Sequence, residues 1–218
     1  RKENVRYAVI NLMQLYFKKD EYAKASGYAN YVLNGEGLMD ENLWQQAKLT
    51  LSKTALENGE YDDAIVHLDT LSKAMNITGA EAKYLLAKTY FFKGEFGKSD
   101  TVIYRLVEQV PSFPYWIAKG FILLADNFIA GEDIYNARVT FQSVIDNADN
   151  QELVGIAKEK LTLLNDSEKK KEEEKEAKKK EAPQEIEFLT GSNKENQLFE
   201  PDSVTNKSTK VREAKDEN

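Results

Sequence analysis

The residues that could carry chemistry in this chain are few, and they centre on one histidine. His67 is the only histidine among 218 residues, and cysteine is absent. Asp62, Asp63 and Asp69 stand close to it in the sequence and could suggest a metal site. Metal sites, however, usually gather several converging ligands that include more than one histidine or cysteine. We therefore expect no metal, and we interpret His67 as a surface residue of an acidic helix.

The motifs that enzymes commonly need are also missing. A hydrolase requires a nucleophile beside a base, and no nucleophile motif surrounds His67. No glycine-rich phosphate loop occurs, and the carboxylates fall at positions expected to be exposed on helices. We predict a protein that is not an enzyme, with no catalytic residues and no cofactor.

The composition argues against two further classes of function. The formal net charge is −7 at pH 7, whereas binding to nucleic acid requires a basic face. No apolar run approaches the roughly 18 residues that a membrane-spanning helix needs. We expect neither a nucleic-acid partner nor a transmembrane segment. Hydrophobic residues still make up 41% of the chain, which is enough to build a core.

The elements that must position these residues follow a pattern that recurs four times. Each unit is anchored on a small residue, and apolar or aromatic residues stand at fixed offsets of −13, −9, −3, +4 and +7 from it. The anchors, which lie 39, 35 and 38 residues apart, are Ala25, Ala64, Ser99 and Ala137. Fixed offsets within units of variable spacing are typical of a repeat array.

Each unit is predicted to be two helices joined by a short turn. The offsets −13 and −9 fall on one face of a 3.6-residue helix, and the offsets 0, +4 and +7 fall on one face of a second helix. A small anchor fits where two antiparallel helices cross closely, because a long side chain would push them apart. Glycine in the turn can take a positive φ and end the first helix. The four predicted turns are 19–21, 58–60, 93–95 and 131–133.

The pattern resembles the tetratricopeptide repeat, a helix-turn-helix unit of about 34 residues. The third unit matches the types expected by that family's consensus at Leu86, Ala87, Tyr90, Gly94, Phe96, Ser99, Ile103, Leu106 and Pro111. The second unit has Ala55 where an aromatic residue is usual, the first has Asp20 for glycine, and the last places Gly131 one residue early. The resemblance implies an all-α fold, a right-handed solenoid of about four such units.

The sequence divides into three parts. Residues 1–166 are predicted to form the repeat domain, and its last helix, 151–164, is expected to cap the apolar face of the final repeat. Residues 167–181 are nearly all charged and are predicted to form a helical extension or a linker. Residues 182–218 hold too little apolar surface to offset the entropy of ordering, so they are predicted to be a disordered tail. Because the chain opens on Arg1 without an N-terminal cap, we expect further repeats before it.

A second resemblance concerns the location of the protein. The segments 116–120 and 143–147 are similar to the ends of long bacterial repeat proteins of the cell envelope. This resemblance implies a periplasmic or outer-membrane-associated protein, with a cytoplasmic location as the open alternative.

The function predicted from these observations is a non-catalytic interaction scaffold. In proteins of the resembling family the first helices line a concave groove, and here that groove would bind a helix or extended peptide of a partner protein. The alternative is an architectural or oligomerisation module of a longer repeat protein, with no peptide ligand of its own. A further alternative is that the groove residues contact a neighbouring repeat or the chain's own cap. The predicted groove residues are Tyr7, Gln14, Phe17, Lys53, Leu56, Tyr84, Lys88, Phe91, Ile122 and Asp126.

Overall fold

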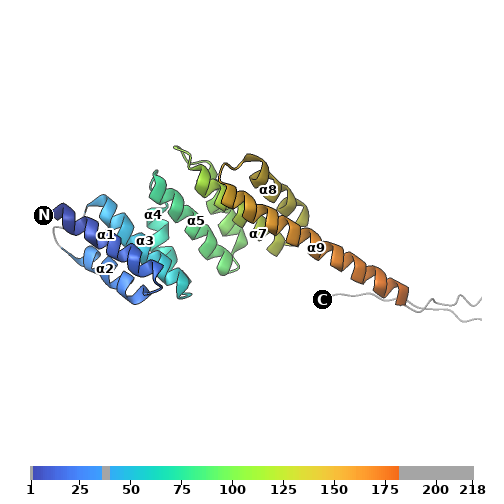
Figure 1. Cartoon of the computed structure of the whole chain (residues 1–218), viewed down its shortest axis with the longest axis horizontal. Helices are drawn as coiled ribbons and strands as arrows, with labels where there is room; N and C mark the ends of the chain where they lie inside the picture. Colours follow the sequence, from blue (N-terminus) through green and yellow to red (C-terminus); the bar gives the residue numbers. More distant parts are fainter. Residues whose placement is uncertain (1, 36–39, 182–218) are drawn as a thin grey trace, which may run out of the picture. The chain divides into compact units, whose positions relative to one another are not determined.

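The computed structural model describes residues 2–35 and 40–181, and all the regular structure in these ranges is α-helical (Figure 1). The helices are α1 (Lys2–Lys18), α2 (Tyr22–Asn34), α3 (Glu41–Glu57), α4 (Tyr61–Leu71), α5 (Ile77–Phe92), α6 (Phe96–Val107), α7 (Pro114–Ala130), α8 (Ile134–Asn147) and α9 (Gln151–Glu181). The predicted disordered tail, 182–218, lies outside the described residues. No helix in the described part is both long and apolar enough to cross a membrane.

Helices that are neighbours in the sequence are also neighbours in space. From α1 to α8 each helix packs against the next one along the chain (Figure 1). The first helices of successive pairs, α1, α3, α5 and α7, also contact one another in order. Successive second helices α2, α4, α6 and α8, all within the described ranges, do not come within 8 Å of one another at their Cα atoms. The fold is therefore all-α with helix pairs stacked in sequence order, an arrangement compatible with an α-solenoid.

The small anchor residues lie where the sequence pattern predicts, at the tightest points of the core. Ala25, Ala64, Ser99 and Ala137 are all completely inaccessible to solvent. The one polar anchor has a specific partner, because Asn127 Nδ2 of α7 donates a hydrogen bond of 2.9 Å to Ser99 Oγ. Serine is therefore small enough for this crossing, and its hydroxyl oxygen has a hydrogen-bond partner.

The four turns share one backbone conformation, whatever residue occupies them. The residue five before each anchor has a positive φ: 59° at Asp20, 76° at Gly59, 74° at Gly94 and 61° at Glu132. The backbone N–H of the next residue donates to the carbonyl of the residue nine positions before the anchor, as in Glu60 N to Ala55 O at 2.8 Å. This is the bond that closes a Schellman-type helix end. The glycine that the sequence places early, Gly131, has a φ of −89° and does not make the left-handed turn.

A partly buried polar network joins α3, the N-cap residue of α5 and the segment that follows α6. Asn76 Nδ2 donates to Gln45 Oε1 at 3.2 Å, and Asn76 Oδ1 accepts from Gly79 N at 2.9 Å, which caps α5. Gln109 Nε2 donates to the Asn76 carbonyl at 3.4 Å and receives a 2.6 Å bond at Oε1 from Lys83 Nζ. Burial lowers the pKa of Lys83. The repeat pattern did not predict this network.

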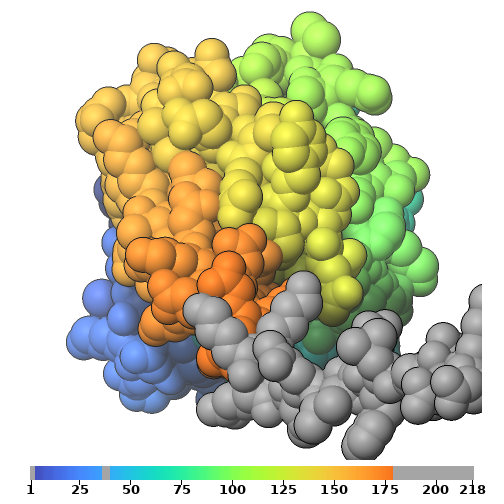
Figure 2. Space-filling view, turned by 90° about the vertical axis from the view of Figure 1, so that its right-hand side faces the viewer, coloured from blue at the N-terminus to red at the C-terminus, as the bar shows by residue number. Residues whose placement is uncertain are grey.

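The beginning of α9 covers the apolar end of the repeats. Asn150 Oδ1 accepts from Leu153 N at 2.9 Å and so starts the helix. Leu153, Ala157 and Leu164 are buried in one cluster with residues of α7 and α8, such as Phe141. In Figure 2 the orange residues of α9 lie directly against the yellow residues of α7 and α8. The same helix continues through the charged segment to Glu181.

The shared turn conformation predicts opposite effects for one substitution at two nearby glycines. An added Cβ would meet no atom within 4 Å at either Gly94 or Gly97, but only Gly94 has a positive φ. Gly94→Ala should lower the free energy of unfolding by about 1–2 kcal/mol, because the left-handed conformation is strained for an L-residue. Gly97→Ala, within α6, should raise it by up to about 1 kcal/mol. Urea unfolding followed by circular dichroism measures both, and equal losses in the two variants would contradict the assigned turn.

Candidate functional site

Two adjoining hollows lie along the first helices α3, α5 and α7. The larger, of about 310 Å³, is lined by Tyr84, Lys88, Phe91 and Phe92 of α5, Lys119, Ile122, Leu123 and Asp126 of α7, and Leu153, Ile156 and Lys160 of α9. The smaller, of about 170 Å³, is lined by Lys53, Leu56, Glu57, Tyr61, Leu85, Lys88 and Phe92. Lys88 and Phe92 border both hollows, and we call the two together the groove.

The groove brings together most of the residues predicted from the sequence. Those that line it are Lys53, Leu56, Tyr84, Lys88, Phe91, Ile122 and Asp126. The other three, Tyr7, Gln14 and Phe17, belong to α1 and line neither hollow. The side chain of Tyr7 is 71% exposed, and the Phe17 ring packs on Tyr22 with a centroid separation of 5.4 Å. The first unit therefore does not share the groove of the later ones.

Two ammonium groups in the groove have no carboxylate partner among the described residues. Lys53 Nζ pairs with Glu81 Oε1 at 2.5 Å, but Lys88 and Lys119 form no such ion pair. Their ammonium groups lie over aromatic faces instead. Lys88 Nζ is 5.4 Å from the ring centroid of Phe92, and Lys119 Nζ is 4.5 Å from that of Tyr84. Cation–π contacts of this kind stabilise a charge only modestly, so the two cations can also attract an anionic group.

The rings around Lys119 form a cluster that holds its side chain in place. Its Nζ lies 5.1 Å from the Trp116 centroid and 5.6 Å from that of Tyr115. Burial lowers the pKa of Lys119 and the charge of Lys88 lowers it further, while the carboxylates of Glu81 and Glu152 oppose the shift. Burial also raises the pKa of Tyr84 to about 12, with Tyr115 and Asp126 adding to the effect. Tyr84 thus keeps its proton at neutral pH and can donate a hydrogen bond.

The far wall of the groove is supplied by α9. Lys160 Nζ donates to both carboxylate oxygens of Asp126, at 2.9 and 3.0 Å. Burial raises the pKa of the Asp126 carboxyl, while the hydrogen bond from Lys160 opposes the rise. This pair ties α9 to α7 and leaves Leu153 and Ile156 facing the hollow. The sequence predicted α9 as a cap; its role as a wall depends on packing that periodicity does not encode.

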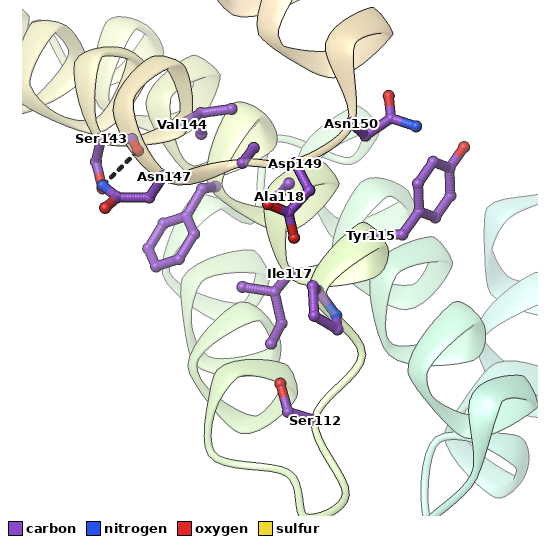
Figure 3. Close-up of a pocket in the computed structure, with 12 residues that line it drawn as sticks. Ser112, Tyr115, Ile117, Ala118, Ser143, Val144, Asn147, Asp149 and Asn150 are labelled. Carbon is purple, nitrogen blue, oxygen red and sulfur yellow. Dashed lines mark hydrogen bonds between the residues drawn. The ribbon is translucent and has the colours of Figure 1, made fainter.

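A separate apolar cavity of about 310 Å³ lies between the start of α7 and the connection from α8 to α9 (Figure 3). Figure 3 shows Ser112 and Ile117 on one side and the 143–150 segment on the other. Its polar rim is already engaged, since Asn147 Nδ2 donates to the Ser143 carbonyl at 2.8 Å and Asn150 caps α9. The helical periodicity does not predict this cavity, because it lies at the ends of helices and not on the faces of the first helices.

His67 is less exposed than the sequence interpretation proposed. The imidazole is half-buried, and its Nδ1 atom is buried without a hydrogen-bond partner in the described part of the chain. Burial lowers the pKa of His67, the charge of Lys48 lowers it further, and Asp63 opposes the shift. No group of three or more histidine, cysteine or acidic residues within the described ranges could hold a metal ion.

A scan against protein-family models finds no match to the chain, and a search of curated proteins finds no match either.

The surroundings of His67 predict its titration. Its pKa should lie below the ordinary 6.5, should rise in Lys48→Gln and should fall further in Asp63→Asn. Because the folded-state pKa is the lower one, His67 favours folding above pH 6.5 and loses this contribution as the pH falls through the folded value. NMR of the imidazole gives the pKa directly, since the chain has one histidine. A value at or above 6.5 would contradict the buried position.

Proposed function

We propose that this chain is a non-catalytic interaction scaffold of tetratricopeptide-like units, forming a right-handed solenoid, whose groove binds a segment of a partner protein. Three features support the repeat assignment. The helix pairs pack in sequence order, the anchors are fully buried, and the left-handed turn residue recurs at the same offset in every unit.

The packing of the helices supports a groove on the first-helix side. Successive first helices contact one another. The successive second helices α2, α4, α6 and α8 have no pair of Cα atoms within 8 Å of one another. A stack that is tight on one side and open on the other curves toward the tight side. The first helices α3, α5 and α7 would then form the inner surface.

The observation that carries the proposal is the chemistry of the groove lining. Phe91, Ile122, Leu123 and Ile156 supply apolar surface. Lys88 and Lys119 add positive charge, and neither lysine forms an ion pair within the described chain. Such a surface suits an amphipathic segment that carries both apolar and acidic side chains. The ligand would lay its apolar side chains on the groove floor and direct a carboxylate at the lysines.

The chain's own cap leaves this surface available. The α9 helix forms a wall through the pair of Lys160 with Asp126, yet a hollow of about 310 Å³ stays open beside Lys88 and Lys119. The ion pair with the cap therefore occupies the carboxylate of Asp126, whereas the ammonium groups of Lys88 and Lys119 form no ion pair with the cap.

Panning a random peptide library displayed on phage against the full chain tests the proposal. We expect the enriched peptides to combine acidic with aliphatic or aromatic residues. Their binding should also weaken as salt concentration rises, because the attraction between exposed charges is screened. Enrichment of basic peptides would contradict the proposed chemistry of the groove, and enrichment of none would favour the architectural alternative.

Variants locate the binding on the groove. Lys88→Glu together with Lys119→Glu should weaken a selected peptide by about tenfold or more, which corresponds to about 1.4 kcal/mol. Tyr84→Ala should cost over about 1 kcal/mol, as central aromatic anchors usually do. Tyr7→Ala is the matched control, because Tyr7 is an exposed first-helix tyrosine outside the groove. Calorimetry gives the affinities and circular dichroism verifies the fold. Equal losses in Tyr7→Ala and Tyr84→Ala would exclude the groove as the site.

A further inference from the structure

A polar cavity of about 420 Å³ lies between α2, α3 and α4, and no residue of the groove lines it. We call it the α2–α4 cavity. Three apolar residues, Leu51, Ala55 and Val66, form part of its lining. The remaining lining residues are polar or charged, namely Ser26, Asn30, Thr54, Asn58, Glu60, Asp63 and His67.

The cavity exists because the second unit lacks the ring that the other units place there. In the first unit Tyr16, nine before the anchor, stacks on Tyr28, three after it, with centroids 5.6 Å apart. In the second unit the same two slots hold Ala55 and His67. The third and fourth units have Tyr90 and Phe128 in the slot of Ala55. The cavity therefore includes the space beside Ala55 that an aromatic side chain would occupy.

Two buried polar atoms of this cavity have no hydrogen-bond partner in the described part of the chain. Thr54 is only 5% exposed, yet its Oγ1 is unpartnered, as is His67 Nδ1. Two other buried helical threonines bond to the carbonyl one turn back: Thr50 to Gln46 O at 2.9 Å and Thr89 to Leu85 O at 2.8 Å. Buried polar groups are rarely left unpaired. Both atoms are shielded from solvent, so a ligand in the cavity reaches either of them only when its side chain turns toward the cavity.

The lining offers hydrogen-bond acceptors and negative charge. Glu60 and Asp63 are exposed carboxylates at the cavity, and no lysine or arginine lines it. The charged groups that act on His67 are Lys48 of α3 and Asp63 of α4, while α2 contributes the uncharged Ser26 and Asn30. Since burial lowers the pKa of His67, its ring is neutral near pH 7 and carries one acceptor nitrogen.

We propose that the α2–α4 cavity binds the guanidinium group of an arginine side chain from a partner protein. A guanidinium is flat, carries five N–H donors and is always charged, so it matches both the missing ring and the acceptors. Glu60 and Asp63 pair with its charge, and Thr54 Oγ1 accepts one of its hydrogen bonds after the threonine side chain turns toward the cavity. Leu51, Ala55 and Val66 pack on its methylene stem. This site is independent of the groove, so either can fail without the other.

The single histidine makes a direct probe of this cavity. The imidazole NMR signal of the full chain is followed while N-acetyl-arginine amide, its neutral isostere N-acetyl-citrulline amide, or N-acetyl-tyrosine amide is added. The arginine amide should shift the signal saturably and lower the pKa of His67, because a bound cation disfavours the imidazolium. The citrulline amide should bind about tenfold more weakly, since charge-assisted bonds are the stronger ones. Equal binding of arginine and citrulline amides, or a response to tyrosine alone, would overturn the proposal. Tighter binding of free arginine than of the amide would overturn the assignment to a protein side chain.

Variants show whether the response comes from the cavity. Ala55→Tyr restores the residue that two other units carry in this slot, and it should abolish the shift by filling the space. Thr54→Val removes the unpartnered hydroxyl and should weaken arginine amide binding several-fold. The matched control is Thr50→Val, one turn away, because that hydroxyl is already satisfied by Gln46. Binding that survives in both Ala55→Tyr and Thr54→Val would overturn the proposal.

Discussion

The close crossing of the two helices in each unit is the constraint on which the rest of the structure depends. Helices approach to a distance set by the side chains at their contact, and here the contact residues are Ala25, Ala64, Ser99 and Ala137, all fully buried. With so little side chain at the crossing, the first helices can also reach one another across units. The groove depends on this packing, because the first helices α3, α5 and α7 line it on the side that their paired second helices do not cover.

Departures from the repeat pattern alter the surface of the molecule at two places. Where the repeat is kept, an aromatic ring fills the space nine residues before the anchor, as Tyr16 does against Tyr28. Where Ala55 replaces the ring, a polar cavity opens beside Thr54 and His67. At the end of the array α9 takes the place of a further unit and supplies Lys160 to the groove wall. A repeat protein can vary in this way because each unit contacts mainly its neighbours.

The sequence predicted the all-helical fold, the buried anchors and the positions of the turns, because these follow from periodicity and local backbone chemistry. It failed where the outcome depends on contacts between units. Glu132, and not the neighbouring Gly131, takes the left-handed turn position. The hydrogen bond that closes the helix requires a left-handed residue five positions before the anchor, whether or not that residue is glycine. The network of Gln45, Asn76 and Gln109 joins residues more than thirty positions apart, and no spacing rule identifies such partners. The periodicity likewise places Tyr7 on a first-helix face without showing that the groove begins only at α3.

Isoleucine methyl NMR tests whether the part of the groove formed by α5, α7 and α9 binds a peptide. Ile122 and Ile156 line the groove, whereas Ile65 of α4 and Ile77, at the start of α5, do not. On titration with a peptide selected for binding to the full chain, the account predicts shifts at the δ1 methyls of Ile122 and Ile156, with Ile65 and Ile77 unchanged. Shifts confined to Ile65 and Ile77 would show that the peptide binds elsewhere and would contradict the account.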